Sequence, residues 1–316
     1  MSRNRLDAVG GFCRILGDKN MRIIGLIAVY NEELFIEAIL EYHLAQKIEL
    51  YLIDNESTDG TALIARKYLG HGLIGIESLQ RRGLFRLNQI LSRKQELAQS
   101  LAADWFIHLD ADEIHMPPEP GQTLAQAIED VDSAGYNAVN FLEFTFIPTI
   151  ESPDHAHPHF QETMCWYYPF LPRSLHRVKA WKKQPGPVDL VSRSGHFVAF
   201  QKQFIYPVPF QMRHYQFLSV AHAIQKYALR RHPAKELAKG KHGWREQLDP
   251  VTVRLPSCSQ LHEVKDNSRL DFSRPRSVHF LDNRIARQPN RLPGIRIRDY
   301  NPVKRLLQRL VTKISK

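Results

Sequence analysis

The sequence predicts an α/β fold in which a mostly parallel central sheet is flanked by helices. Three apolar runs, residues 23–29, 50–53 and 105–109, each end in polar residues. The first two are followed by helical patterns, and this alternation of strand, polar turn and helix is typical of parallel strands joined by right-handed crossovers. The third run is apolar at nearly every position, which indicates a central strand covered on both faces.

The length and composition of the chain agree with one such domain. The chain has 316 residues, of which 43% are hydrophobic, so it can bury a large core. We expect a lead-in over residues 1–20, the α/β domain over residues 21–265, and a basic arm with an amphipathic C-terminal helix over residues 266–316.

Further elements of the domain follow from the spacing of apolar residues. Spacings of three and four predict helices over residues 123–131 and 219–231, and a weaker alternation predicts a strand over residues 136–147. The same helical spacing over residues 80–94 predicts a helix with a basic face. Residues 148–172 contain five prolines and are expected to form a long loop.

Acidic residues stand directly behind two of the predicted strands. Asp110, Asp112 and Glu113 follow the run 105–109, and ligands of open α/β sheets bind beyond the carboxyl ends of the strands. Two carboxylates two residues apart suit magnesium or manganese, which one or two carboxylates hold while substrate phosphates supply further oxygens. Asp54 closes the second run, where it either accepts hydrogen bonds from a ligand or forms an Asx-turn.

Three segments together resemble the family-2 glycosyltransferases of the GT-A fold. They are residues 28–32 (Ala-Val-Tyr-Asn-Glu), 54–61 (Asp-Asn-Glu-Ser-Thr-Asp-Gly-Thr) and 105–113 (Trp-Phe-Ile-His-Leu-Asp-Ala-Asp-Glu). Their order and spacing match the family over roughly residues 21–150. The second half is similar only in short pieces, chiefly Gly195-His196 and Arg213-His214-Tyr215, the latter followed by a helix that carries Lys226.

The resemblance implies a Rossmann-like GT-A domain with two functional halves. The nucleotide-sugar half would cover residues 21–135 and the acceptor half residues 136–265. Tyr30 and Asn31 would lie against the nucleotide of an activated sugar, although Asn31 is also suited to cap the following helix. Asp54 would contact the base.

The diphosphate and the cation would be bound between these segments. Arg82 or Arg86 would contact the diphosphate, unless their charged face is only solvated. Asp110 would contact the nucleotide sugar and, with Asp112, would hold a manganese or magnesium ion. His214, or less favourably His196, would supply a third metal ligand or a diphosphate contact.

An inverting transfer needs a base that takes the proton of the acceptor hydroxyl. Asp189 lies about eighty residues past the Asp-x-Asp motif, where the family usually keeps this carboxylate. Glu143 is the alternative, because an acid inside an apolar run is costly unless it has a partner or a task.

The formal net charge of +10 restricts the class of partners rather than the fold. No nucleic-acid motif and no basic-aromatic interleaving occur, so we expect no nucleic-acid partner. Residues 302–316 combine an apolar stripe with flanking lysines and arginines, and they either pack on the domain or lie on an anionic membrane. The absence of an apolar run of eighteen residues, and three scattered cysteines, favour a cytoplasmic, peripheral protein.

We therefore expect a metal-dependent hexosyltransferase. It would move a sugar from a nucleoside-diphosphate sugar to a hydroxyl of a glycan or lipid-linked acceptor, with inversion, in polysaccharide or glycoconjugate synthesis. A sugar nucleotidyltransferase is an alternative, but it would carry a glycine-rich loop where this chain has Tyr30-Asn31-Glu32-Glu33. A non-catalytic membrane or nucleic-acid adaptor on a transferase scaffold is a second alternative, against which Asp54, Asp110 and Asp112 argue.

Overall fold

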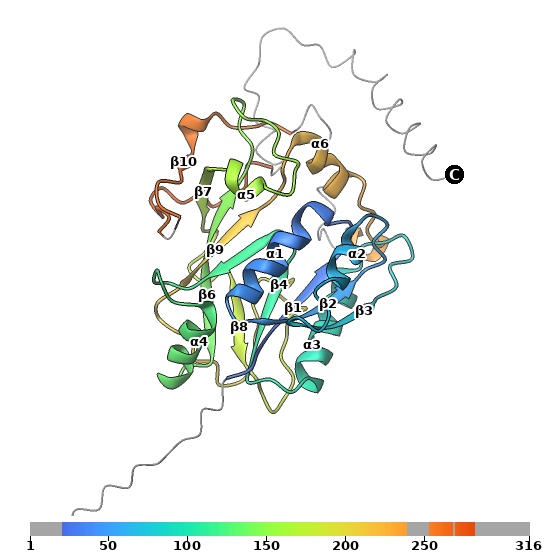
Figure 1. The fold of residues 1–316 in the computed structure, drawn as a ribbon, viewed down its shortest axis with the longest axis vertical. Helices are drawn as coiled ribbons and strands as arrows, with labels where there is room; N and C mark the ends of the chain where they lie inside the picture. The colour runs from blue at the N-terminus through green and yellow to red at the C-terminus, as the bar shows by residue number, and fades with distance from the viewer. Residues whose placement is uncertain (1–20, 239–252, 268, 282–316) are drawn as a thin grey trace, which may run out of the picture. The chain divides into compact units, whose positions relative to one another are not determined.

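The computed structural model describes residues 21–238, 253–267 and 269–281 (Figure 1). The expected lead-in and the expected amphipathic helix over residues 302–316 lie outside these ranges. Within the described ranges, no helix is both long enough and apolar enough to span a membrane.

The first part of the domain alternates strands and helices as the sequence predicts. Its four strands are parallel and lie in the order β4, β1, β2, β3. The elements are β1 (Ile23–Val29), α1 (Glu33–Ala45), β2 (Glu49–Asp54), α2 (Thr61–Arg66), β3 (Leu73–Ser78), α3 (Leu87–Ser100) and β4 (Trp105–Asp110).

The second part extends the same sheet with antiparallel strands. β8 lies between β4 and β6 and is antiparallel to both, and β7 and β10 follow on the outer side of β6. β9 is parallel to β6 and antiparallel to β5. The strands are β5 (Glu113–Met116), β6 (Ala138–Phe146), β7 (Trp166–Phe170), β8 (Val178–Lys182), β9 (Phe210–Tyr215) and β10 (His262–Glu263).

Short helices connect these strands and close the domain. Thr123 begins α4 with a capping box, in which its side chain accepts from Gln126 N and the Gln126 side chain accepts from Thr123 N. The helices are α4 (Leu124–Ser133), α5 (Phe160–Thr163), α6 (Val220–Ala223) continued by the π-helix Ile224–Ala228, α7 (Ala234–Ala238) and the 3₁₀ turn Cys258–Gln260.

Alternate side chains of the parallel strands pack into two apolar cores, one on each face of the sheet. Ile27 and Leu109 pack with α1 on one face, while Ile24 and Phe106 pack with α3 on the other. In Figure 1, α1 crosses in front of the sheet. A β-carbon at Gly25 would lie 2.5 Å from the Leu109 side chain, so the contact of β1 with β4 requires glycine there.

The predicted α/β fold is therefore confirmed, with three local differences. The sheet is fully parallel only in its first part, and in the second part β6 and β9 are the one parallel pair among the described strands, because the strands after β5 are joined mainly by loops rather than by helical crossovers. The expected helix over residues 80–94 begins only at Leu87, because Arg82 and Gly83 adopt positive φ angles of 50° and 70° that helices do not contain. The expected loop over residues 148–172 contains α5 and β7.

Candidate active site

The ends of three strands bring the acidic segments together at one edge of the sheet. In the register of the strands, Ala28 lies beside Asp110 and Val29 lies beside Asp54. Parallel strands end on the same side, so the turns after β1, β2 and β4 share one edge. The three segments that carry the family resemblance therefore meet in space.

Asn31 fastens the turn after β1 to the turn after β2. Its backbone N–H donates to Ser57 Oγ at 3.1 Å, and its side-chain Oδ1 accepts from Thr58 N at 2.8 Å. Asn31 also has a positive φ of 55°, a conformation that asparagine tolerates better than most residues. It does not cap α1, whose N-cap is Glu32 without a side-chain hydrogen bond. Asn31 thus shapes the surface that faces the site.

Asp54 closes β2 and holds the turn that follows it, although it bonds the third residue on rather than the second, which an Asx-turn requires. Its Oδ1 accepts the backbone N–H of Ser57 at 3.0 Å, and the residue is half-buried. Asp54 therefore stabilises the turn in another way than the expected Asx-turn, and its contact with a nucleotide base stays a prediction.

Arg81 is the guanidinium that lies within the cluster of turns. Its guanidinium carbon lies 3.5 Å from the centroid of the Tyr30 ring, and the residue is only 6% exposed. Its backbone N–H donates to Glu56 Oε2 at 2.9 Å. Its Nη1 is buried and finds no hydrogen-bond partner in the described part of the chain. A buried guanidinium with an unused donor is suited to an anionic ligand.

The two arginines singled out from the sequence are placed differently. Arg82 is exposed, and its guanidinium donates to Gln80 Oε1 at 3.2 and 3.3 Å. Arg86 is half-buried at the N-cap position of α3. The expected helix put Arg82 and Arg86 on one face, whereas the loop that replaces it turns Arg81 inward. A diphosphate contact by Arg82 or Arg86 stays a prediction.

Asp110 is held by a lysine from the second half of the domain. Its Oδ2 lies 2.9 Å from Lys179 Nζ and 3.6 Å from His108 Nε2. Lys179 is fully buried in β8 and also contacts Glu113. Burial opposes the charge of Asp110, but Lys179 and His108 outweigh it and keep the pKa of this carboxyl well below its usual range. The Asp110 side chain is 45% exposed, so the carboxylate is both ionised and accessible.

His108 is oriented from behind by α3. Lys94 is buried and donates to His108 Nδ1 at 3.1 Å and to the carbonyl of Leu109 at 2.7 Å. An imidazole that accepts at Nδ1 carries its proton on Nε2, which is the nitrogen that faces Asp110. Burial, and then the charge of Lys94, lower the pKa of His108 to about 3. His108 is therefore a neutral group that positions Asp110.

Asp112 lies deeper, between a lysine and a histidine. Its Oδ2 is 3.0 Å from Lys226 Nζ and 3.6 Å from His214 Nε2. Burial opposes the charged carboxylate, but Lys226 and His214 more than offset this and lower the pKa of Asp112. Burial also opposes the charge of His214, yet Asp112 and Glu143 raise the pKa of the imidazole to about 9. The structure thus brings His214 to Asp112, as the sequence analysis anticipated, and its role as a metal ligand stays a prediction.

Glu143 stands behind His214, away from the strand ends. Its Oε1 lies 2.6 Å from His214 Nδ1, and its Oε2 accepts from Arg177 Nε and Nη2, each at 2.7 Å. Burial opposes its charge, but Arg177 and His214 hold the pKa of Glu143 well below its usual range. A carboxylate held ionised in this way is a weak base. The geometry favours a role in orienting His214, which is how carboxylates support histidine ligands of metals.

Asp189 makes its contacts in a turn of its own. Its Oδ1 accepts the backbone N–H of Ser192 at 3.0 Å, and its backbone pairs with Ala199. None of the contacts described for Asp189 involves Asp110, Asp112 or His214, so its role as base stays a prediction.

The residues that follow Asp189 do reach the carboxylate cluster. A β-carbon at Gly195 would lie 2.7 Å from His108 Nε2, and His196 is half-buried against Arg177. Glycine is therefore needed at position 195, where φ is also positive.

The donor atoms at this edge suit a divalent cation that is shared with a ligand. No group of three histidine, cysteine, aspartate or glutamate side chains forms a ready-made metal cage in the ranges that the structure describes. Magnesium and manganese do not require such a cage, because one or two carboxylates and substrate phosphates suffice. Asp110 and Asp112 are ionised, and Glu143 holds Nδ1 of His214 so that Nε2 faces Asp112, where the raised pKa of His214 requires Nε2 to release its proton before it binds a cation. The residues therefore fit such an ion.

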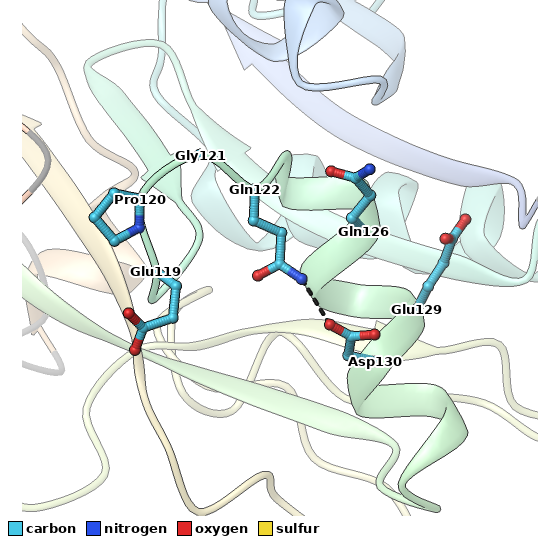
Figure 2. Close-up of a pocket in the computed structure, with 7 residues that line it drawn as sticks. All are labelled: Glu119, Pro120, Gly121, Gln122, Gln126, Glu129 and Asp130. Atoms are coloured by element: carbon cyan, nitrogen blue, oxygen red, sulfur yellow. Dashed lines mark hydrogen bonds between the residues drawn. The ribbon is translucent and has the colours of Figure 1, made fainter.

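A separate hollow lies on the surface at the start of α4 (Figure 2). Its volume is about 510 Å³, and Gln122 Nε2 donates to Asp130 Oδ2 at 2.6 Å on its wall. It shares no residue with the carboxylate cluster. The lining residues are Glu119, Pro120, Gly121, Gln122, Gln126, Glu129 and Asp130.

Comparison with known proteins gives one family match. Residues 26–174 match the family model described as glycosyl transferase family 2. No curated protein matches the chain.

Several solved structures are similar to part of the chain. TarS residues 1–349 of S. aureus is 13% identical, with a TM-score of 0.39, over 62% of this chain and 60% of TarS. The same protein with UDP-GlcNAc is 20% identical, with a TM-score of 0.29, over 41% and 34%. Glucosyl-3-phosphoglycerate synthase of Mycobacterium tuberculosis, solved with Mn²⁺, UDP and glucosyl-3-phosphoglycerate, is 18% identical, with a TM-score of 0.27, over 39% and 44%. The chain thus spans less than two thirds of each of these structures.

Proposed function

We propose, because residues 26–174 match the model of glycosyl transferase family 2, that this protein transfers a sugar from a nucleoside-diphosphate sugar to a hydroxyl group of an acceptor. The observation that carries the proposal is the pair of ionised carboxylates, Asp110 and Asp112, where the parallel strands end. Both lie beside the turns that carry Tyr30 and Asp54, which we assign to the nucleotide.

Some residues of this chain would bind the nucleotide sugar, and others hold the binding residues in position. The guanidinium of Arg81 is stacked on Tyr30 and has an unused N–H group, which would donate to the phosphates of the nucleotide sugar. It would do so in place of, or together with, the exposed Arg82. Lys179 and the neutral imidazole of His108 fix Asp110.

A divalent cation, manganese or magnesium, completes the proposal. Asp110, Asp112 and His214 would hold it, with Glu143 orienting the imidazole of His214. When bound, such a cation neutralises charge on the departing nucleoside diphosphate.

The finer points of the reaction rest on the family resemblance. We propose inversion at the sugar carbon, with a glycan or lipid-linked hydroxyl as acceptor and polysaccharide or glycoconjugate synthesis as the setting. For the base, Asp189 remains the prediction, since the contacts of Glu143 favour a positioning role. We also propose a cytoplasmic location, contact with an anionic membrane surface, and no nucleic-acid partner.

A screen of nucleotide sugars tests the proposal. Melting temperatures of the full chain are measured with each nucleoside-diphosphate sugar, with and without Mn²⁺, and a donor that stabilises the protein is then tried in transfer assays. A binding donor should raise the melting temperature, because a ligand that binds only the folded state stabilises it. If no nucleotide sugar shifts the melting temperature in either condition, the proposed function is wrong.

The variant Asp112→Asn then tests the carboxylate pair. We expect transfer to fall by about 100-fold or more, the usual scale for loss of one electrostatic contact to the transition state. The fold should survive, because Lys226 keeps Glu32 as a partner at 3.0 Å. Asp130→Asn, an exposed aspartate of α4, is the matched control and should retain transfer. Near-wild-type turnover of Asp112→Asn would refute the assignment.

A further inference from the structure

Lys226 is a buried lysine that the proposed reaction leaves without a task. It lies on the π-helical turn Ile224–Ala228 that continues α6. Its Nζ is 3.0 Å from Glu32 Oε2 and 3.0 Å from Asp112 Oδ2, and it lies 4.5 Å from the centroid of the Phe35 ring. π-Helical turns are rare in proteins, and those that occur are often found at functional sites.

The position of Lys226 conflicts with a cation at Asp112. An ammonium in contact with Asp112 Oδ2 repels any divalent ion that approaches the same carboxylate. The side chains of Lys226 and Asp112 are only 7% and 11% exposed, so water screens this repulsion little. The free protein therefore neutralises Asp112 with its own cation.

Lys226, like Lys179, bridges one proposed ligand of the cation and a second carboxylate. For the fully buried Lys179 these partners are Asp110 and Glu113. Lys226 bridges Asp112 and Glu32, and Glu32 belongs to the turn after β1. If Lys226 releases Asp112, its charge is still paired with Glu32, which avoids the large penalty of a buried unpaired charge.

We propose that Lys226 is an internal counter-ion of the cation site, which holds Asp112 in the free protein and remains on Glu32 when a divalent cation binds Asp112. This inference rests on the cation site of the proposed function. It follows that the donor-free protein binds the cation weakly. The negative charge of a bound diphosphate would offset the repulsion, so cation and donor favour each other's binding.

Binding of Mn²⁺ alone tests the inference without any transfer assay. Mn²⁺ is titrated into the donor-free full chain, and free Mn²⁺ is followed by electron paramagnetic resonance. Lys226→Met should bind Mn²⁺ at least about tenfold more tightly, because even part of the repulsion at contact distance exceeds the free energy of a tenfold change. Lys182→Met, which removes a half-exposed ion pair with Asp132, should bind as the wild type does. Unchanged or weaker binding by Lys226→Met would overturn the proposal.

Variants of Glu32 provide a second test of the inference. Glu32→Gln removes the alternative partner, so Lys226 should hold Asp112 more firmly and Mn²⁺ binding should weaken. If Lys226→Met does not fold because two carboxylates lose their counter-ion, the double variant Glu32→Gln/Lys226→Met removes one of these charges. The double variant should also bind Mn²⁺ more tightly than the wild type. An affinity equal to that of the wild type in the double variant would contradict the inference.

The outcome also separates this inference from the proposed function. If the wild type transfers sugar while Lys226→Met keeps the wild-type Mn²⁺ affinity, only the counter-ion role is wrong. If Lys226→Met instead loses affinity for UDP with no change in Mn²⁺ binding, Lys226 is a phosphate ligand and the inference is likewise overturned. If no nucleotide sugar binds under any condition, the proposed function fails, whatever Mn²⁺ does.

Discussion

The two halves of the domain contribute opposite charges to the carboxylate cluster. The first half, residues 21–135, supplies most of the acids, of which Asp110 is half-exposed and the others are buried, whereas the second half, from residue 136 onward, supplies most of the buried cations. The acids are Glu32, Asp110, Asp112 and Glu113, and the cations are Arg177, Lys179, His214 and Lys226. Glu143 is the exception, an acid of the second half that holds two cations of its own half.

Because the acids and their counter-charges come from different halves, neither half can form the site alone. A carboxylate taken out of water is costly unless a partner of opposite charge compensates it. The parallel half aligns the acids through its strand register, but their counter-charges arrive from β8, β9 and the π-helical turn. Removal of a single cation from the second half should therefore be felt by the first half.

The largest expected effect comes from breaking this complementarity at Lys179. Lys179→Met leaves Asp110 and Glu113 without their shared cation, and the free energy of unfolding should fall by about 3–5 kcal/mol. Urea unfolding measures the loss. Lys182→Met, in the same strand but half-exposed, should cost less than about 1 kcal/mol.

A second variant shows whether the loss at Lys179 is electrostatic. Glu113 is 2% exposed, so Glu113→Gln in the Lys179→Met background removes one uncompensated buried charge and should restore part of the stability. Equal losses for Lys179→Met and Lys182→Met would show that the two halves do not depend on each other's charges.

The contrast between the halves also explains what the sequence could predict. In the first half, each strand, turn and helix is encoded by a short continuous segment, so β1, β2, β4 and the acids behind them were identified. The nearly continuous apolar runs that mark these strands match their burial on both faces. Asp110 and Asp112 were placed correctly at the strand end because a strand that stops in acids is a local pattern.

The counter-ions could not be assigned because their partners are far away in sequence. Lys179 lies 69 residues from Asp110, and Lys226 lies 194 residues from Glu32. No local pattern specifies which acid such a lysine will meet. One signal was available: Lys179 interrupts the apolar stretch Val178-Lys179-Ala180-Trp181, as Glu143 interrupts its own strand. A charge within an apolar strand predicts a buried partner without naming it.

Positive φ angles account for the error at residues 80–86. Apolar spacing predicted a helix there, but spacing does not report backbone conformation, and Arg82 and Gly83 both adopt positive φ. The backbone N–H groups of Arg81 and Arg82 both donate to Glu56 Oε2, at 2.9 and 3.2 Å. This long-range contact stabilises the loop and directs Arg81 toward Tyr30.

The two halves also differ in how the pKa of a buried histidine is shifted. His43, within the first half, meets no buried acid, and burial lowers its pKa to about 4. His214, between the halves, has a pKa raised to about 9 by Asp112 and Glu143, which outweigh burial. The depressed pKa of His43 means that its contribution to stability is present above the unfolded pKa of about 6.5 and is lost as pH falls toward 4.

Replacing His43 should therefore make the free energy of unfolding fall less steeply as the pH is lowered. The difference in unfolding free energy between the wild type and His43→Leu should shift by about 3 kcal/mol in favour of the variant between pH 7 and pH 4. Urea unfolding at several pH values measures it. His71→Gln, at an exposed position, is the control and should follow the wild type. A constant difference for His43→Leu would show that the pKa of His43 is the same in the folded and unfolded states.

The smallest expected effect concerns Asp54, which belongs to the first half alone. Its described contact is with the turn that follows it, at Ser57 N, and not with a cation of the second half. Asp54→Ala should therefore cost little stability, while nucleotide affinity should weaken by about 1.5–3 kcal/mol, the scale of a lost hydrogen bond to a charged group. Calorimetric titration with UDP measures this affinity, and urea unfolding measures the stability.

The control for Asp54 separates a binding role from a turn role. Ser57→Ala keeps the backbone N–H that Asp54 accepts but removes the hydroxyl that accepts from Asn31 N, so it perturbs the joined turns without removing a carboxylate. If Asp54 binds the nucleotide, Asp54→Ala weakens UDP binding far more than Ser57→Ala does. If both variants lower the melting temperature equally and leave UDP affinity unchanged, Asp54 serves the turn alone. In that case the first half would recognise the nucleotide through Tyr30 and Arg81, whose stacked pair lies at the same edge of the sheet.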